Sequence, residues 1–223
     1  MAILSGMDDA LPDTRRLELT GPAGKLEARL DRPRDGVEPR FVAVFGHPDP
    51  LQGGTMFNNV VVHATRTLVQ SGAAVLRFNF RGVGRSEGEH ADGVGERDDY
   101  LAALRRLKEL HPDVRPRLAA GFSFGAIRAM ECAGEADLYL GVAPPITLRK
   151  YVGLPRVEVP SALVIAGDDE LVPRPDADFL DQHFPIRMEL EVVEGSKHLF
   201  HGRLEALRDA VHRSVTRLLA ASD

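Results

Sequence analysis

The sequence predicts an α/β fold with a mostly parallel central sheet of about eight strands and helices on both of its faces. Beyond residue 40, short runs of consecutive apolar residues alternate with longer segments that carry apolar residues at helical spacing. The short runs lack the polar–apolar alternation of a half-exposed strand, which is typical of strands buried on both faces of a parallel sheet. Two segments that do alternate precede them and predict an antiparallel hairpin at the start of the sheet.

The first half of the chain is predicted to form the hairpin, two buried strands and two helices. Gly-Pro-Ala-Gly (21–24) lies between the hairpin strands and supplies the residue types that a tight turn requires. The helix after the first buried strand is expected to end at Gly72, because glycine readily adopts the left-handed conformation that closes a helix. We expect hairpin strands at 15–20 and 25–31, buried strands at 41–46 and 73–80, and helices at 58–72 and 95–110.

The second half is expected to continue the alternation up to a C-terminal helix. A segment that closes on small apolar residues (115–120) runs as a strand into Gly-Phe-Ser-Phe-Gly (121–125). Later strands are predicted at 138–143, 161–167 and 186–195, and helices at 126–136, around 175–183 and at 203–222. The interval 144–160 between two of these strands is too short for a helical cap over the sheet.

The composition is that of an ordinary globular protein, and its 223 residues fit one domain over 1–223. The net charge of −5 gives no sign of a surface for nucleic acid or for an anionic membrane. No apolar run approaches the length of a membrane span, and the N-terminus lacks the basic region of a signal peptide, so we expect a cytoplasmic location. The single cysteine, Cys132, excludes an internal disulfide and a cysteine-based zinc site; we expect no metal and no cofactor.

Ser123 stands at the junction of an expected strand and helix, with a glycine two residues before it and another two residues after it. This spacing is typical of a nucleophile elbow, a sharp turn that exposes a serine at the end of a strand. Side chains at Gly121 or Gly125 would collide with the backbone of such a turn. Because the same short pattern also occurs in ordinary turns, the rest of the chain has to supply a base and an acid.

Acidic residues follow the strand predicted at 161–167. Asp168, Asp169 and Glu170 come directly after it. Because parallel strands end at the same edge of a sheet, these carboxylates are expected to lie near Ser123. A serine is a weak nucleophile unless a base takes its proton and an acid orients that base. The cluster therefore contains the candidate acid, and both aspartates are candidates.

Two histidines follow the strand predicted at 186–195. The resulting chain order of serine, acid and histidine is the order found in sheets of this type. His198 lies in the loop after the strand, whereas His201 is expected to begin the last helix. We therefore favour His198 as the general base.

Catalysis at a serine also requires N–H donors for the oxygen that becomes negatively charged. The backbone N–H of Phe124 follows the serine at a helix N-terminus and is expected to be one donor. A second donor is expected from the loop 47–59. Pro48 has no N–H, so Asp49 is the first residue of this loop that is a plausible donor.

Five segments carry a family resemblance: GHPDPLQGGTMFNN (46–59), LRFNFRGVGRSEGEH (76–90), GFSFG (121–125), GDDELVP (167–173) and HLFHG (198–202). On these segments the chain resembles the α/β-hydrolase superfamily over nearly its whole length. More narrowly, it resembles small bacterial serine hydrolases related to dienelactone hydrolase and to the catalytic domain of prolyl oligopeptidase. The resemblance implies an α/β-hydrolase fold without a cap domain, and its Asp-Glu-Leu-Val-Pro match favours Asp169 as the acid.

Three departures from the family pattern affect the site. Where the family has His-Gly after the strand, this chain has His47-Pro48, which leaves the second N–H donor less defined. The spacing from Gly167 to Asp169 is one residue shorter than is often found, so Asp168 stays an alternative acid. Dienelactone hydrolase itself has cysteine at the elbow, so its particular activity is not implied.

The residues and the resemblance together predict an open site that cleaves carboxylic esters or thioesters of small, accessible acyl substrates through an acyl-enzyme intermediate. A peptidase or amidase of the prolyl oligopeptidase type is one alternative, and a non-catalytic binding module on a hydrolase scaffold is another. Further apolar residues near the site are Phe122, which is expected in the core, and Phe124. The walls that bind the substrate are expected to be Leu51, Phe57, Ile146, Tyr151, Leu171 and Phe200.

Overall fold

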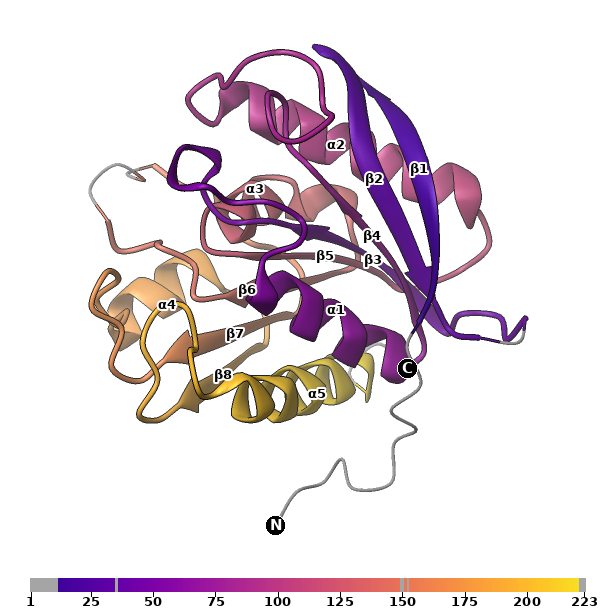
Figure 1. Ribbon diagram of the computed structural model, residues 1–223. Helices are drawn as coiled ribbons and strands as arrows, with labels where there is room; N and C mark the ends of the chain where they lie inside the picture. Colours follow the sequence, from indigo (N-terminus) through magenta and orange to yellow (C-terminus); the bar gives the residue numbers. More distant parts are fainter. Residues whose placement is uncertain (1–11, 35, 149–150, 152, 221–223) are drawn as a thin grey trace.

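The computed structural model describes residues 12–34, 36–148, 151 and 153–220, which build one eight-stranded sheet with helices on both faces (Figure 1). The strands are β1 (Asp13–Gly21), β2 (Gly24–Arg32), β3 (Phe41–Gly46), β4 (Ala73–Phe78), β5 (Arg117–Phe122), β6 (Leu138–Val142), β7 (Ser161–Ala166) and β8 (Met188–Val193). Their order in the sheet is β1-β2-β4-β3-β5-β6-β7-β8. The hairpin β1–β2 joins β4 antiparallel, and all other neighbouring strands are parallel, which confirms the predicted fold class.

The central strands separate two apolar cores, one on each face of the sheet. In β3, Val42 and Val44 pack into one core, while Phe41, Ala43 and Phe45 pack into the other. Every residue of β3 to β7 is buried. Because both faces of these strands are covered, their sequences are mostly apolar and lack a regular polar–apolar alternation.

Two groups of helices cover the sheet. α1 (Asn59–Gln70) and α5 (Leu204–Ala220) contribute to one core and lie side by side in Figure 1. α2 (Val94–Leu110), α3 (Phe124–Glu131) and α4 (Ala177–His183) contribute to the other. Two short 3-10 helices, η1 (Pro50–Gln52) and η2 (Ala133–Glu135), lie in connections.

The starts of two helices next to the candidate site differ from the sequence prediction. The helix expected at 126–136 begins at Phe124, directly after the serine, and its α-helical part ends at Glu131. The last helix begins at Leu204, so the prediction that His201 begins it is wrong: His201 lies in an exposed turn. Phe200 and Gly202 have φ values of 52° and 70°, and such left-handed residues cannot belong to a helix.

The carboxyl ends of the parallel strands are not covered by a helical layer. Between β6 and β7, the described residues form no α-helix. Within the described ranges, no helix is long and apolar enough to cross a membrane. The loops after β3, β5, β7 and β8 meet at this uncovered edge, where ligands of α/β sheets bind.

Candidate active site

Ser123 lies in a strained turn between β5 and α3. Its φ of 53° and ψ of −117° fall in a region that residues other than glycine rarely occupy. A Cβ atom on Gly121 would overlap the backbone of Gly125, and one on Gly125 would overlap Gly46 at the end of β3. The two glycines are therefore required because the turn packs directly against its own helix and against the neighbouring strand.

Ser123, His198 and Asp169 form one hydrogen-bonded chain. His198 Nε2 lies 3.0 Å from Ser123 Oγ, and His198 Nδ1 lies 2.8 Å from Asp169 Oδ2. The side chains of His198 and Asp169 are only 6% and 5% exposed, so little water competes for these contacts. The three residues follow β5, β8 and β7, and the parallel topology brings them together as the sequence predicted.

The alternative acid and base lie apart from this chain of hydrogen bonds. Asp168 is exposed, and its backbone N–H donates to the carbonyl of Ser196. His201 is exposed in the turn before α5. The carboxylate that reaches the imidazole is therefore that of Asp169.

The environment of Asp169 keeps its carboxylate ionised. Burial opposes ionisation, but hydrogen bonds from His198 and from the backbone N–H groups of Leu171 and Val172 outweigh burial and lower the pKa of the carboxyl below its usual value. The two backbone donors bind Oδ1 at 2.9 Å each, which leaves Oδ2 for the imidazole. Asp169 thus holds the imidazole with its Nδ1–H toward the carboxylate and its Nε2 toward the serine.

His198 is also held through its backbone and its ring face. Its N–H donates to Glu170 Oε2 at 3.3 Å, and its ring packs against that of Phe122 with the centroids 5.3 Å apart. Glu170 belongs to the acidic cluster after β7, and the sequence alone predicts no role for it. Its contact with His198 joins the loop after β7 to the loop after β8.

The loop after β3 begins with a buried histidine. His47 is fully buried; its Nδ1 lies 2.6 Å from the carbonyl of Pro48, and its Nε2 accepts from the N–H of Phe80 at 3.1 Å. One neutral tautomer, with the proton on Nδ1, satisfies both contacts. Burial lowers the pKa of His47 to about 4, so the ring is neutral near neutral pH.

Two backbone segments at the serine correspond to the expected N–H donors. The N–H of Phe124 begins α3, and no acceptor for it is present in the described part of the chain. Asp49 follows Pro48 and caps η1: its side chain accepts from Leu51 N–H at 2.9 Å. Pro48, Asp49 and Phe124 line the same cavity as Ser123.

An open cavity of about 380 Å³ lies above the serine. One side is polar and comes from the loop after β3; the other is mainly apolar and comes from the loops after β6, β7 and β8. Tyr151 and Leu171 line it as predicted. Besides Pro48, Asp49, Ser123 and Phe124, the remaining lining residues are Gln52, Gly53, Gly54, Asn58, Pro145, Leu148, Val172, His198 and Leu199.

Four of the predicted wall residues lie outside the cavity lining. Ile146 and Phe200 are buried in the two cores of the sheet, where their side chains pack rather than face a ligand. Leu51 projects into solvent from η1 with 72% of its surface exposed. The guanidinium of Arg29 lies over the ring of Phe57, with Arg29 Cζ 4.7 Å from the ring centroid. Their neighbours in the same loops line the cavity instead.

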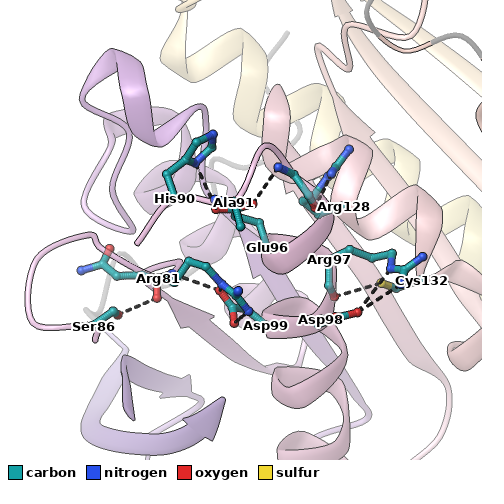
Figure 2. A network of polar contacts seen from close by, with 12 residues as sticks. Arg81, Ser86, His90, Ala91, Glu96, Arg97, Asp98, Asp99, Arg128 and Cys132 are labelled. Atoms are coloured by element: carbon teal, nitrogen blue, oxygen red, sulfur yellow. Dashed lines mark hydrogen bonds and ion pairs between the residues drawn. The ribbon is translucent and has the colours of Figure 1, made fainter. Parts of the chain in front are cut away.

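The segment 79–93, which contains most of the LRFNFRGVGRSEGEH motif (76–90), is held by α2 (Figure 2). Arg81 makes bidentate hydrogen bonds of 2.9 and 2.7 Å to Asp99. Glu96 accepts from the N–H groups of Ala91 and Gly93 at 2.9 and 2.8 Å. Both carboxylates are fully buried. These contacts fix the segment that follows β4, and they account for the motif structurally.

Metal ligation has no support in the described ranges, where no cluster of three or more histidine, cysteine, aspartate or glutamate side chains could hold an ion. Cys132 is buried, and burial raises the pKa of its thiol to about 12. The thiolate is therefore strongly disfavoured, and Ser123, not Cys132, is the candidate nucleophile.

Comparison with known proteins identifies solved structures that the whole chain resembles. No protein-family model matches the chain. It is 36% identical to an alpha-beta serine hydrolase homologue from Coxiella burnetii, over 90% of this chain and 97% of that one, with a TM-score of 0.83. It is 31% identical to XC6422 from Xanthomonas campestris, described as an a/b serine hydrolase without lid, over 92% and 94% of the two chains, with a TM-score of 0.81. The "Uncharacterized protein RP471" of Rickettsia prowazekii is 34% identical over 208 residues, 88% of this chain and 87% of that protein.

Proposed function

The chain belongs to the α/β-hydrolase superfamily of serine hydrolases, and on that premise we propose that it cleaves carboxylic esters or thioesters of small acyl substrates. The observation that carries the proposal is the unbroken hydrogen-bonded path from Ser123 through His198 to Asp169 at the floor of an open cavity. This arrangement activates a serine hydroxyl, and acyl transfer is the chemistry that such a hydroxyl performs.

In the proposed reaction, Ser123 Oγ attacks the carbonyl carbon while His198 Nε2 takes the hydroxyl proton. The imidazolium then gives this proton to the departing alcohol or thiol, and the acyl group stays on the serine. Water attacks the acyl-enzyme with His198 again as base, which releases the carboxylic acid and restores the serine. Asp169 remains ionised throughout, and it stabilises the charged imidazolium.

We assign the developing oxyanion to the N–H of Phe124 and to the N–H of Asp49. The first lies at the N-terminus of α3, where the helix dipole favours negative charge. The second comes from the loop after β3, which lines the cavity beside the serine. Loss of one such donor typically costs about 2.7–4 kcal/mol of transition-state stabilisation.

The cavity supports a small, partly apolar substrate. Its volume of about 380 Å³ lies at the lower end of the range for small-molecule sites. Tyr151, Leu171 and Leu199 give one side an apolar surface suited to a short acyl or alcohol group. The absence of an α-helix among the described residues between β6 and β7 leaves the entrance open to soluble esters.

Active-site labelling and a substrate series test the proposal together. A fluorophosphonate should modify the purified protein at Ser123, and chromogenic esters of graded acyl length should be turned over. Ser123→Ala should lose both reactions while its circular dichroism stays unchanged, because the substitution removes only the hydroxyl. Turnover by folded Ser123→Ala would overturn the mechanism. Anilides cleaved faster than esters would indicate an amidase, and a wild-type protein that neither labels nor turns over ester would indicate a binding module.

The assignment of the acid has its own test in two neighbouring aspartates. Asp169→Asn should lower kcat about 10⁴-fold, since a carboxamide can turn its N–H toward Nδ1 and hold the wrong tautomer. Asp168→Asn carries the same chemical change on an exposed side chain and should leave kcat nearly unchanged. The reverse ranking would move the acid one residue toward the N-terminus.

A further inference from the structure

The loop that lines the polar side of the cavity is held at the backbone of one buried residue, Met56. The N–H of Met56 donates to Asn79 Oδ1 at 2.9 Å, and its carbonyl accepts from Arg77 Nη1 at 2.9 Å. Met56 and Asn79 are 0% and 1% exposed, so water does not compete for either contact. Both backbone groups of this residue are thus fixed by side chains from the end of β4.

Each of these two side chains is in turn held by a carboxylate of β2. Arg77 Nε lies 2.6 Å from Asp31 Oδ2, and the two side chains are 9% and 0% exposed. Asn79 Nδ2 donates to Glu27 Oε2 at 2.8 Å. A carboxylate can only accept, so Glu27 fixes which end of the amide faces it and leaves Oδ1 for Met56.

Residues 77–80, at the end of β4 and directly after it, also hold the beginning of the loop. Phe80 N–H donates to His47 Nε2 at 3.1 Å, so residues 77–80 anchor the loop at both His47 and Met56. Between these anchors lie Pro48, Asp49, Gly53 and Gly54, all of which line the cavity. The position of this wall relative to Ser123 is therefore set from β4, with support from the N-terminal hairpin.

We infer that Asn79, held by Glu27, is a positioning residue for hydrolysis: by binding the backbone N–H of Met56, beside the contact of Arg77 with the carbonyl of the same residue, it sets the place of the loop that supplies the second oxyanion donor. The inference rests on the proposed function, because it needs a reaction for the loop to serve. Neither Asn79 nor Arg77 lines the cavity, so neither touches a substrate. A misplacement of about 1 Å in such machinery lowers the rate on the order of 10²-fold.

The experiment removes two contacts in separate variants: that of Glu27 with the Asn79 amide, and that of Asn79 with the Met56 N–H. Glu27→Ala leaves the Asn79 amide free to reverse and to present its NH₂ to the N–H of Met56. Asn79→Ala removes the contact altogether. Glu27→Gln keeps an acceptor for Asn79 and serves as the rescue variant. Glu18→Ala is the matched control, because Glu18 pairs with Glu27 across the hairpin but its side chain contacts Lys25 at the surface.

We expect Glu27→Ala to lower kcat roughly 10-fold and Asn79→Ala up to about 100-fold, with a smaller change in KM, because a misplaced oxyanion donor is felt in the transition state. Hydrogen exchange at the Met56 amide should accelerate in both variants. Glu27→Gln and Glu18→Ala should keep wild-type kcat and exchange. The pH dependence of kcat should keep its midpoint in all four variants, since the base and its acid are untouched.

If folded Asn79→Ala and Glu27→Ala both kept wild-type kcat, and the wild type acted through Ser123, the positioning role would be overturned. The proposed function would still stand. An equal loss in Glu18→Ala would show general damage to the hairpin and would also overturn the positioning role. A wild-type protein without any ester turnover would refute the proposed function, and the positioning role would fall with it.

Discussion

His47 begins the loop after β3, and its side chain is fully buried. We expect its protonation at low pH to destabilise the folded protein at this loop. Its neutral ring makes two contacts at once, donating from Nδ1 to the carbonyl of Pro48 and accepting at Nε2 from Phe80 N–H. A second proton on the ring would remove the acceptor and place a charge in the core. Burial accordingly lowers the pKa of His47 from its ordinary 6.5 to about 4.

The sign of the effect follows from where the proton binds. Below about pH 6.5 the unfolded chain binds a proton at His47 that the folded protein does not bind. The contribution of neutral His47 to the free energy of unfolding is therefore fully present above that pH, and it is lost as the pH falls toward 4. The loss contributed by this residue is about 2 kcal/mol by roughly pH 5 and about 3 kcal/mol by roughly pH 4. Burial also lowers the pKa of His63 and of His111, so these residues add acid sensitivity of the same sign.

A comparison of wild type with His47→Gln isolates the contribution of this one ring. The glutamine oxygen can still accept from Phe80 N–H, but nothing at the position titrates. Urea unfolding should show the variant less stable than wild type near neutral pH, with the difference shrinking by about 2 kcal/mol by roughly pH 5. If both proteins lost equal free energy over this range, His47 would not be the neutral buried histidine that the structure implies.

Two further pairs of substitutions, each with its control, test the base and the elbow. His198→Ala should abolish most of the ester hydrolysis, because His198 supplies the ring nitrogen that contacts Ser123, whereas His201→Ala should leave the rate unchanged; an inactive but folded His201→Ala would move the base into the turn before α5. Gly125→Ala should lower both the melting temperature and kcat, since its Cβ would overlap the backbone of β3, while Gly134→Ala meets no atom within 4 Å and should be neutral in both assays; a tolerated Gly125→Ala would contradict the tight elbow.

The sheet could be predicted because burial on both faces leaves a plain trace in composition. β3 agrees with its predicted range because Phe41 to Gly46 is an uninterrupted apolar run bounded by polar residues and proline. The elbow could be predicted because its glycines are required sterically at a fixed spacing from Ser123. That the acidic residues after β7 and the histidines after β8 would lie near Ser123 could be predicted because parallel strands end at one edge. The choice of Asp169 over Asp168 came from the family resemblance, and the choice of His198 over His201 came from its expected place in the loop.

The cavity walls could not be predicted in the same way, because they depend on the direction of single side chains in irregular loops. Leu199 and Phe200 are neighbours, yet Leu199 lines the cavity and Phe200 is fully buried. Phe200 adopts a left-handed backbone conformation in the turn, and no periodic pattern in the sequence predicts which of the two residues faces the cavity. Ile146 illustrates the same difficulty: it is buried in a core while Pro145 and Leu148 line the cavity.

The hydrogen bonds to the backbone of Met56 also affect which positions of the loop after β3 can be substituted. Arg77 and Asn79 bind the backbone of the loop and not its side chains, so neither contact depends on which side chains occupy positions 51 and 52. Leu51 and Gln52 are exposed, whereas Gly53 has a φ of 76° that favours glycine. Libraries confined to positions 51 and 52 would therefore vary one side of the entrance while the reactive groups stay in place. Divergence of substrate preference by point mutation would have the same freedom.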